Sequence, residues 1–278
     1  MRYGLKLSQN APVDEYRDVW RIADQAGFDS LWNMDHFAAL GGDPTGDIFD
    51  AWTLLGAMAE ATSRVRIGCM VTGNTYRHPG VLAKMAVTVD HLSGGRLEFG
   101  LGAAWAENEH TMFDLQFGTA GERLDRLEEA CQVIRSLWTE PRTNFAGRHY
   151  RITDAIAEPK PVQRPYPPIW IGGSGRKRTL RITAEHADVW NSAGDRPEDF
   201  ADLSRVLDDH CAAVGRDPAV IRRTVQVRAG EVSDGLLHKV EGYAQAGADD
   251  VIIIVHAGTA LAQAEAVAEL LPRLRAVG

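Results

Sequence analysis

The sequence contains few cysteines, and their placement already limits the chemistry. Cys69, Cys131 and Cys211 are an odd number and lie far apart, which matches neither a disulfide framework nor the ligand spacing of a zinc site. We therefore expect three free thiols, and the cysteines predict no metal site.

The sequence also lacks an excess of positive charge and any long apolar run. Among its 278 residues, 30 Lys and Arg stand against 38 Asp and Glu, a formal charge of −8, which argues against general affinity for nucleic acid or anionic lipid. No apolar stretch approaches the roughly 20 residues that span a bilayer, and residues 1–6 do not resemble a signal peptide. The sequence predicts a cytoplasmic protein that acts on small molecules, without a nucleic-acid or membrane partner.

Short apolar runs alternate with longer amphipathic segments along the chain, a pattern typical of βα units around a parallel sheet. The predicted strands cover 2–7, 30–33, 65–70, 96–101, 169–171, 188–191, 221–227 and 251–256. The predicted helices cover 12–26, 47–62, 79–92, 124–138, 177–187, 197–214, 235–246 and 260–275.

Eight such pairs predict an α/β fold, a single (β/α)8 TIM barrel spanning residues 1–278, because an open doubly wound sheet usually has fewer strands. Residues 139–168 interrupt the alternation with five prolines before Pro168 and a hairpin-like segment at 144–150. We interpret this segment as an excursion within the one domain, after the fourth βα unit.

In such barrels the active site lies where the strands end, at their carboxyl ends. Asp35 and His36 follow the second predicted strand, where an imidazole can move a proton or polarise a carbonyl. An isolated histidine is more often a surface or packing residue, but this position favours a catalytic role.

The loops after the third and fourth predicted strands give weaker signals. Residues 69–79 are polar and suit a simple βα turn. Residues 100–102 form a G-x-G, but Trp105 stands where a dinucleotide fingerprint needs a small residue. Glu107, Glu109 and His110 lack metal-ligand spacing, so we expect a solvated loop there.

The strongest signal follows the fifth predicted strand. Gly172, Gly173, Ser174 and Gly175 precede Arg176 and two further cations at the expected start of a helix. Glycine backbone and helix-start N–H groups bind anions well. The alternative is a flexible turn beside a solvated basic patch.

Six segments together resemble the luciferase-like monooxygenase family, and most closely its branch that uses the deazaflavin coenzyme F420. The resemblance covers positions 1 to about 195. The segments that carry it are DHF at 35–37, TGNTYRHP at 72–79, SGGRLEFGLG at 93–102, PKPVQRP at 159–165, IWIGGSG at 169–175 and ADVWN at 187–191.

The resemblance implies a cofactor site. It places a non-proline cis peptide at Cys69–Met70, behind the cofactor ring, and the pair Asp35 and His36 at the reactive face. Further residues implied to bind the cofactor are Thr72, Asn74, Ala103, Ala104, Asn108 and, around its phosphate, Gly172, Gly173, Ser174, Gly175 and Arg176.

The resemblance further implies hydride transfer between F420 and a small organic substrate, with His36 supplying a proton or a polarising hydrogen bond, in a possible homodimer. Trp105 and the lack of matching cations make this chain differ from the sugar-phosphate dehydrogenases of the branch. Alternatives are an FMN-dependent monooxygenase with a separate reductase, a non-catalytic flavin-binding barrel, and a barrel lyase, isomerase or hydrolase that binds a substrate phosphate.

Overall fold

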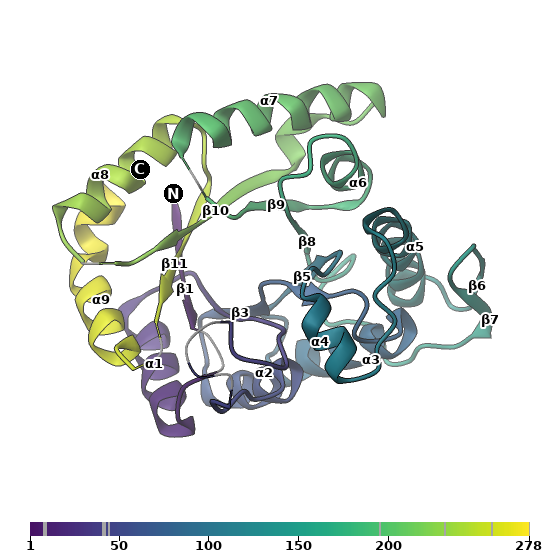
Figure 1. The fold of residues 1–278 in the computed structure, drawn as a ribbon, viewed down its shortest axis with the longest axis horizontal. Helices are drawn as coiled ribbons and strands as arrows, with labels where there is room; N and C mark the ends of the chain where they lie inside the picture. Colours follow the sequence, from purple (N-terminus) through teal and green to yellow (C-terminus); the bar gives the residue numbers. More distant parts are fainter. Residues whose placement is uncertain are drawn as a thin grey trace.

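The computed structural model describes residues 1–7, 10–40, 43, 45–194, 196–230, 232–256 and 258–277. Within this part eight parallel strands form a closed barrel, and a ring of helices surrounds them (Figure 1). In barrel order these strands are β1 (Arg2–Leu7), β2 (Ser30–Asn33), β3 (Arg66–Cys69), β5 (Leu97–Gly102), β8 (Ile169–Gly172), β9 (Val189–Ser192), β10 (Arg222–Arg228) and β11 (Asp250–Val255).

Each barrel strand is followed by a helix, so the predicted (β/α)8 barrel is confirmed. The main helices are α1 (Val13–Ala26), α2 (Ala51–Ala61), α3 (Pro79–Leu92), α5 (Ala120–Thr139), α6 (Thr179–His186), α7 (Pro197–Ala213), α8 (Asp234–Gln245) and α9 (Ala260–Val277). Smaller elements are β4 (Thr72–Gly73), α4 (Glu107–Met112), β6 (Thr143–Ala146), β7 (Arg151–Ala155) and a 3₁₀ turn at Pro218–Val220.

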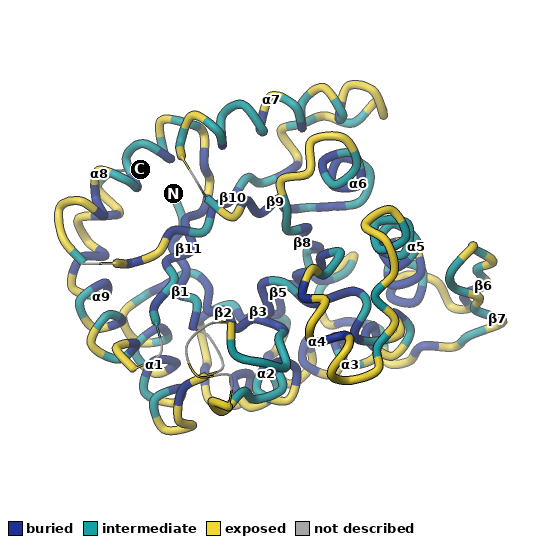
Figure 2. The backbone as a smooth tube through the Cα atoms, viewed as in Figure 1, coloured by how far each residue is buried: buried dark blue, intermediate teal, exposed yellow. Residues whose placement is uncertain are grey.

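Burial explains the sequence pattern of both layers. Most barrel strands are largely buried (Figure 2), and β8 and β11 therefore appear in the sequence as nearly continuous apolar runs. The helices expose one face and bury the other, which gives their amphipathic spacing. Among the described residues, no helix has both the length and the apolar character required to cross a bilayer.

Local capping chemistry sets where helices begin. The predicted helix at 47–62 begins only at Ala51, because Asp50 caps it and accepts a hydrogen bond from the Thr53 N–H at 2.8 Å. Helix α5 begins with a full capping box, in which the Thr119 hydroxyl and the Glu122 carboxylate bond each other's backbone N–H.

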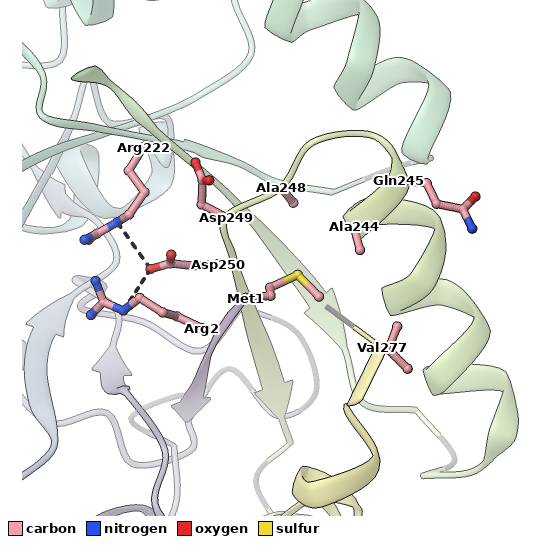
Figure 3. A pocket seen from close by; sticks show the side chains of 9 residues that line it. All are labelled: Met1, Arg2, Arg222, Ala244, Gln245, Ala248, Asp249, Asp250 and Val277. Carbon is pink, nitrogen blue, oxygen red and sulfur yellow. Dashed lines mark ion pairs between the residues drawn. The ribbon is translucent and has the colours of Figure 1, made fainter. Parts of the chain in front are cut away.

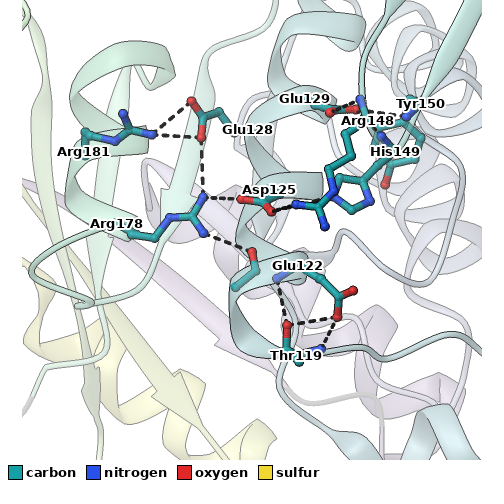
Figure 4. Close-up of polar contacts among 11 residues, drawn as sticks. Thr119, Glu122, Asp125, Glu128, Glu129, Arg148, His149, Tyr150, Arg178 and Arg181 are labelled. Atoms are coloured by element: carbon teal, nitrogen blue, oxygen red, sulfur yellow. Dashed lines mark hydrogen bonds and ion pairs between the residues drawn. The ribbon is translucent and has the colours of Figure 1, made fainter.

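Between α5 and β8 the chain leaves the βα alternation. Strands β6 and β7 form an antiparallel hairpin at the outside of the barrel, beside α5 (Figure 1). The turn is fixed to α5, because backbone N–H groups of residues 148–150 donate to the Glu129 carboxylate at 2.7–3.0 Å (Figure 4).

Charged groups close the amino-terminal end of the barrel. Arg2 and Arg222 both face Asp250 at 3.9 and 3.4 Å (Figure 3). The buried Glu98 pairs with Arg66 and accepts a hydrogen bond from the Trp170 indole.

Above these charges the barrel is filled by large side chains. Trp32 and Trp170 pack edge to face, 4.5 Å between ring centroids, and Met70 packs in the same cluster. This filling leaves the opposite, carboxyl-terminal end of the strands as the place for a ligand.

Candidate functional site

A cavity of about 730 Å³ opens at the carboxyl ends of the strands. Every barrel strand or its trailing loop contributes to its wall. The sequence-predicted residues that line it are Asp35, His36, Met70, Thr72, Ala103, Ala104, Gly172 and Gly173.

The chain bends sharply where β3 ends. The non-proline cis peptide lies at Met70–Val71, so its predicted position at Cys69–Met70 was wrong by one bond. The reason is that strand pairing continues past Cys69, since the Met70 N–H still donates to the Asn33 carbonyl at 2.9 Å. Met70 and Val71 line the cavity, whereas the Cys69 thiol is buried away from it.

Glycines on β5 and β8 make room for this bend. A Cβ on Gly100 would lie 2.1 Å from the Cys69 carbonyl oxygen, and one on Gly102 would lie 2.7 Å from Val71. A Cβ on Gly172 would lie 3.0 Å from Val71. The G-x-G in β5 therefore serves the packing of the bend, which agrees with rejecting it as a dinucleotide fingerprint.

Asp35 lies under the bend and is held from two sides. Its Oδ2 accepts hydrogen bonds from the Arg77 guanidinium at 2.6 Å and from the Gly73 N–H at 3.0 Å. Burial raises the pKa of Asp35, although Arg77 and the Gly73 N–H favour the carboxylate. Among the described residues, its buried Oδ1 has no hydrogen-bond partner, so Asp35 keeps one acceptor for a ligand.

His36 is oriented by Glu109, which the sequence analysis weighed only as a metal ligand. Its Nδ1 lies 3.1 Å from Glu109 Oε1, and the phenol of Tyr76 donates to the same carboxylate. Burial would raise the pKa of Glu109, but hydrogen bonds from His36 and Tyr76 outweigh it and lower that pKa. An ionised carboxylate only accepts, so Nδ1 carries the proton and Nε2 is left for a ligand.

The expected solvated loop at 107–110 was wrong for Glu109 and His110, whereas Glu107 and Asn108 are exposed. Glu109 and His110 are fully buried on the short helix α4. Glu109 also accepts from the N–H groups of Phe37 and Ala38, at 3.2 and 3.1 Å. His110 bonds Thr75 and the Ala106 carbonyl, so both side chains fix the loops that carry the site.

The glycine-rich loop lies partly at the cavity and partly outside it. Gly172 and Gly173 line the cavity, and Gly173 has φ +133°, which other residues rarely adopt. Ser174, Gly175 and Arg176 are exposed, and helix α6 begins only at Thr179.

The cations after this loop are engaged by neighbouring helices. Arg176 pairs with Asp202 on α7 at 2.5 Å. Arg178 pairs with Asp125 on α5 at 2.6 Å, and Arg181 pairs with Glu128 (Figure 4). These pairs dock α6 and the turn before it against α5 and α7.

Two other predicted cofactor residues lie away from the cavity lining. Asn108 is exposed on α4. Asn74 is buried directly behind the bend, with its N–H bonded to the Gly102 carbonyl at 2.9 Å. Asn74 thus ties the loop after β4 to the end of β5.

Four polar residues of the cavity carry no motif and were missed. Lys6, Gln226, Arg228 and His256 lie at the ends of β1, β10 and β11. Lys6 Nζ donates to Gln226 Oε1 at 2.6 Å. Their proximity follows from closure of the barrel, which no local sequence pattern encodes.

One group in the described part has metal-ligand atoms close together, namely Glu128, Glu185 and His186. Arg181 pairs with both carboxylates, and burial together with nearby arginines lowers the pKa of His186 to about 4. The carboxylates are thus already neutralised by cations, and this group lies outside the cavity.

Sequence relatives point to one family. Residues 2–230 match the family model for luciferase-like monooxygenases. An F420-dependent glucose-6-phosphate dehydrogenase of Microbacterium testaceum is 36% identical over 78% of this chain and 64% of its own length. An F420-dependent hydroxymycolic acid dehydrogenase of Mycobacterium tuberculosis is 32% identical over 75% of this chain and 57% of its own. The chain thus spans less than two thirds of these two relatives.

Solved structures share the fold at low identity. An F420-dependent secondary alcohol dehydrogenase in complex with an F420-acetone adduct has a TM-score of 0.87, with 19% identity and 99% of both chains covered. The F420-dependent tetrahydromethanopterin reductase of Methanopyrus kandleri has a TM-score of 0.82, with 16% identity over 98% of this chain and 99% of its own. With its barrel, its bend after β3 and the family match over residues 2–230, the chain belongs to the luciferase-like monooxygenase family.

Proposed function

We propose that the protein is an F420-dependent oxidoreductase that transfers hydride between the coenzyme and a small organic substrate. The observation that carries the proposal is the cavity wall formed by the Met70–Val71 bend and the glycines beside it. The F420-dependent relatives in sequence and structure support the same function.

The residues present fit such a cofactor. Thr72, Ala103 and Ala104 present small side chains around the bend, which suits a broad planar ring. The free Oδ1 of Asp35 is a buried acceptor without a partner among the described residues, which suits a polar edge. In the Gly172–Gly175 loop the N–H groups of Ser174 and Gly175 would hold a phosphate, because the Gly173 N–H donates to the Asn191 carbonyl at 3.0 Å and Arg176 is paired with Asp202.

When bound, the deazaflavin supplies or accepts hydride at one ring carbon. The chain's own part is to orient the substrate and to move a proton. Glu109 keeps a proton on Nδ1 of His36, which lines the cavity, so Nε2 is available to accept a proton from a substrate hydroxyl during oxidation. The imidazolium formed in this way would return that proton to the substrate oxygen in the reverse, reducing direction. Trp105 packs on the His36 ring, 5.4 Å between centroids, and restricts its rotation.

An FMN-dependent monooxygenase is the second candidate. It is favoured by a specific relative, the FMNH2-dependent dimethylsulfone monooxygenase of Pseudomonas putida, which is 26% identical over 82% of this chain and 64% of its own length. Such an enzyme would need a separate reductase. The greater identity to F420-dependent relatives places this function second.

Parallel titrations with F420 and FMN, followed by absorbance, test the proposal. We expect saturable binding of F420 that is at least about tenfold tighter than that of FMN. In His36→Gln, F420 binding should persist while turnover of reduced F420 across a panel of carbonyl and enone substrates falls by about 10²- to 10⁴-fold. Preference for FMN, or turnover that His36→Gln leaves unchanged, would contradict the proposal.

Two finer statements belong to the proposal and stay predictions. We place the protein in the cytoplasm, and we expect a homodimer. A non-catalytic flavin-binding protein and a phosphate-binding lyase, isomerase or hydrolase are the outcomes that absence of redox turnover would favour.

A further inference from the structure

The cavity has two walls of different chemistry. The bend and the glycines belong to the adjacent strands β3, β5 and β8, and they present backbone and small side chains. Lys6, Arg228 and His256 come from β1, β10 and β11, which are also adjacent and lie across the barrel from the first group. We call these three residues the cationic wall.

Within the described residues, the cationic wall has no compensating acid. Among the described residues that line the cavity, Asp35 is the one acid, and its carboxylate is bonded to Arg77. Lys6 Nζ meets the neutral amide oxygen of Gln226, and no ion pair engages Lys6 or Arg228 in the described part of the chain. Uncompensated cations in a concave site favour an anionic ligand.

Lys6 is held in place before any ligand arrives. Gln226 accepts from Lys6 at 2.6 Å and donates to Asn191 Oδ1 at 2.7 Å, and Asn191 donates in turn to Thr224 Oγ1 at 2.9 Å. Burial, with the nearby charge of Arg228, lowers the pKa of Lys6 to about 8. The ammonium thus lacks a counter-charge that a bound anion would restore.

We propose that the substrate carries an anionic group, a carboxylate or a phosphate, which Lys6 and Arg228 bind at the wall opposite the bend. This inference rests on the proposed function, because it assigns the cofactor to the first wall and the substrate to the second. It identifies cations that recognise the substrate at positions where the sequence shows no motif. His256 adds a further donor at the rim.

The test uses protein already saturated with F420, so that the cofactor's own phosphate cannot compete. Benzoate, phenyl phosphate and the neutral benzamide are titrated by calorimetry. We expect both anions to bind at least about tenfold more tightly than benzamide, because a charge-assisted hydrogen bond contributes that much or more. The tighter of the two anions distinguishes a carboxylate site from a phosphate site.

Four variants assign the effect to the cationic wall. Lys6→Met and Arg228→Gln should each weaken anion binding about tenfold while benzamide binding and F420 affinity stay unchanged. Lys239→Met and Arg151→Gln are matched controls, because these cations lie outside the cavity and make no ion pair in the described part. Lys6→Arg, which keeps the charge, should recover most of the affinity.

The outcomes separate the two proposals. If F420 binds but benzoate, phenyl phosphate and benzamide bind alike, the anionic-substrate inference fails and the proposed function stands. If F420 itself does not bind, the proposed function fails and the inference falls with it. Arg228 is exposed, so Arg228→Gln provides a folded test protein even if Lys6→Met does not fold.

Discussion

Glu109 joins four groups of the site through one carboxylate. It accepts from His36, from Tyr76 and from two backbone N–H groups of the loop after β2. A single residue therefore fixes both the proton position on the imidazole and the loop that carries it.

Replacing Glu109 by Gln should lower turnover with a smaller change in cofactor affinity. The amide cannot accept from every donor at once, so the His36 proton is no longer confined to Nδ1. Loss of one hydrogen bond to a charged group is worth about 1.5–3 kcal/mol, so we expect a fall of about ten- to a hundredfold in kcat. Glu107→Gln on the exposed side of α4 is the control; equal kcat for Glu109→Gln and wild type would exclude the positioning role.

The lowered pKa of Lys6 has a signature in stability. Its folded pKa is about 8 against an ordinary 10.5, so between these values the unfolded chain binds more protons than the folded one. The free energy of unfolding should therefore rise with pH across this window. Urea unfolding of wild type and Lys6→Met at pH 7.5 and 10 measures this effect. The free energy of unfolding of the wild type should rise relative to that of the variant between the two pH values. An unchanged difference between the two proteins would be inconsistent with a buried ammonium.

At the level of elements, the bend after β3 depends on glycines in the strands beside it. Gly102→Ala would push a Cβ to within 2.7 Å of Val71. Overpacking of this kind costs about 1–3 kcal/mol, and displacement of the bend should also weaken F420 binding. Gly56 in α2 has open space where a Cβ would lie, so Gly56→Ala should stabilise the protein by about 0.5–1 kcal/mol. Chemical denaturation of both variants measures these opposite changes in the free energy of unfolding. If Gly102→Ala were as stable as the wild type, the bend would not depend on the space beside Gly102.

The elements that the sequence predicted well are those whose pattern is local. The apolar runs of β8 and β11 and the spacing of α5 follow directly from burial. Helix α4 was missed because it has six residues, and the residues it buries are the polar Glu109 and His110. The position of the cis peptide depended on strand pairing with Asn33, which the sequence does not display.

The cationic wall could not be predicted from the sequence, because its residues lie far apart along the chain. Lys6 and Gln226 are 220 positions apart, and closure of the barrel alone brings them together. In contrast, Asp35, His36 and Gly172 could be found, because each lies in the loop after a predicted strand, and the place of these loops at the barrel mouth is a property of the fold class.

At the scale of the whole molecule, charged side chains close the amino-terminal end of the barrel, and the carboxyl-terminal end opens into the cavity. Glu98 lies at the closed end, buried between Arg66, Arg2 and Arg222, at 3.8 and 3.6 Å from the last two. Its strand, β5, also carries the glycines that accommodate the bend. Stability of the closed end therefore affects the geometry of the site.

Glu98→Gln should destabilise the protein by about 3 kcal/mol. It removes a buried negative charge among three arginines, and the lower part of the usual range applies because the arginines are partly exposed. Urea unfolding gives the measurement, with Glu158→Gln on the exposed excursion as control. If the free energy of unfolding fell by less than about 1 kcal/mol, water rather than Glu98 would stabilise the charges of the three arginines.

We propose that the Met70–Val71 bend and the Gly172–Gly175 loop together hold the deazaflavin. A crystal structure of the protein with F420 measures this most directly. We predict the ring system against Met70 and Val71, with the phosphate at the backbone of Gly172–Gly175 and free space toward Lys6 and Arg228. Coenzyme bound elsewhere, or a ring lying on the cationic wall, would contradict the account.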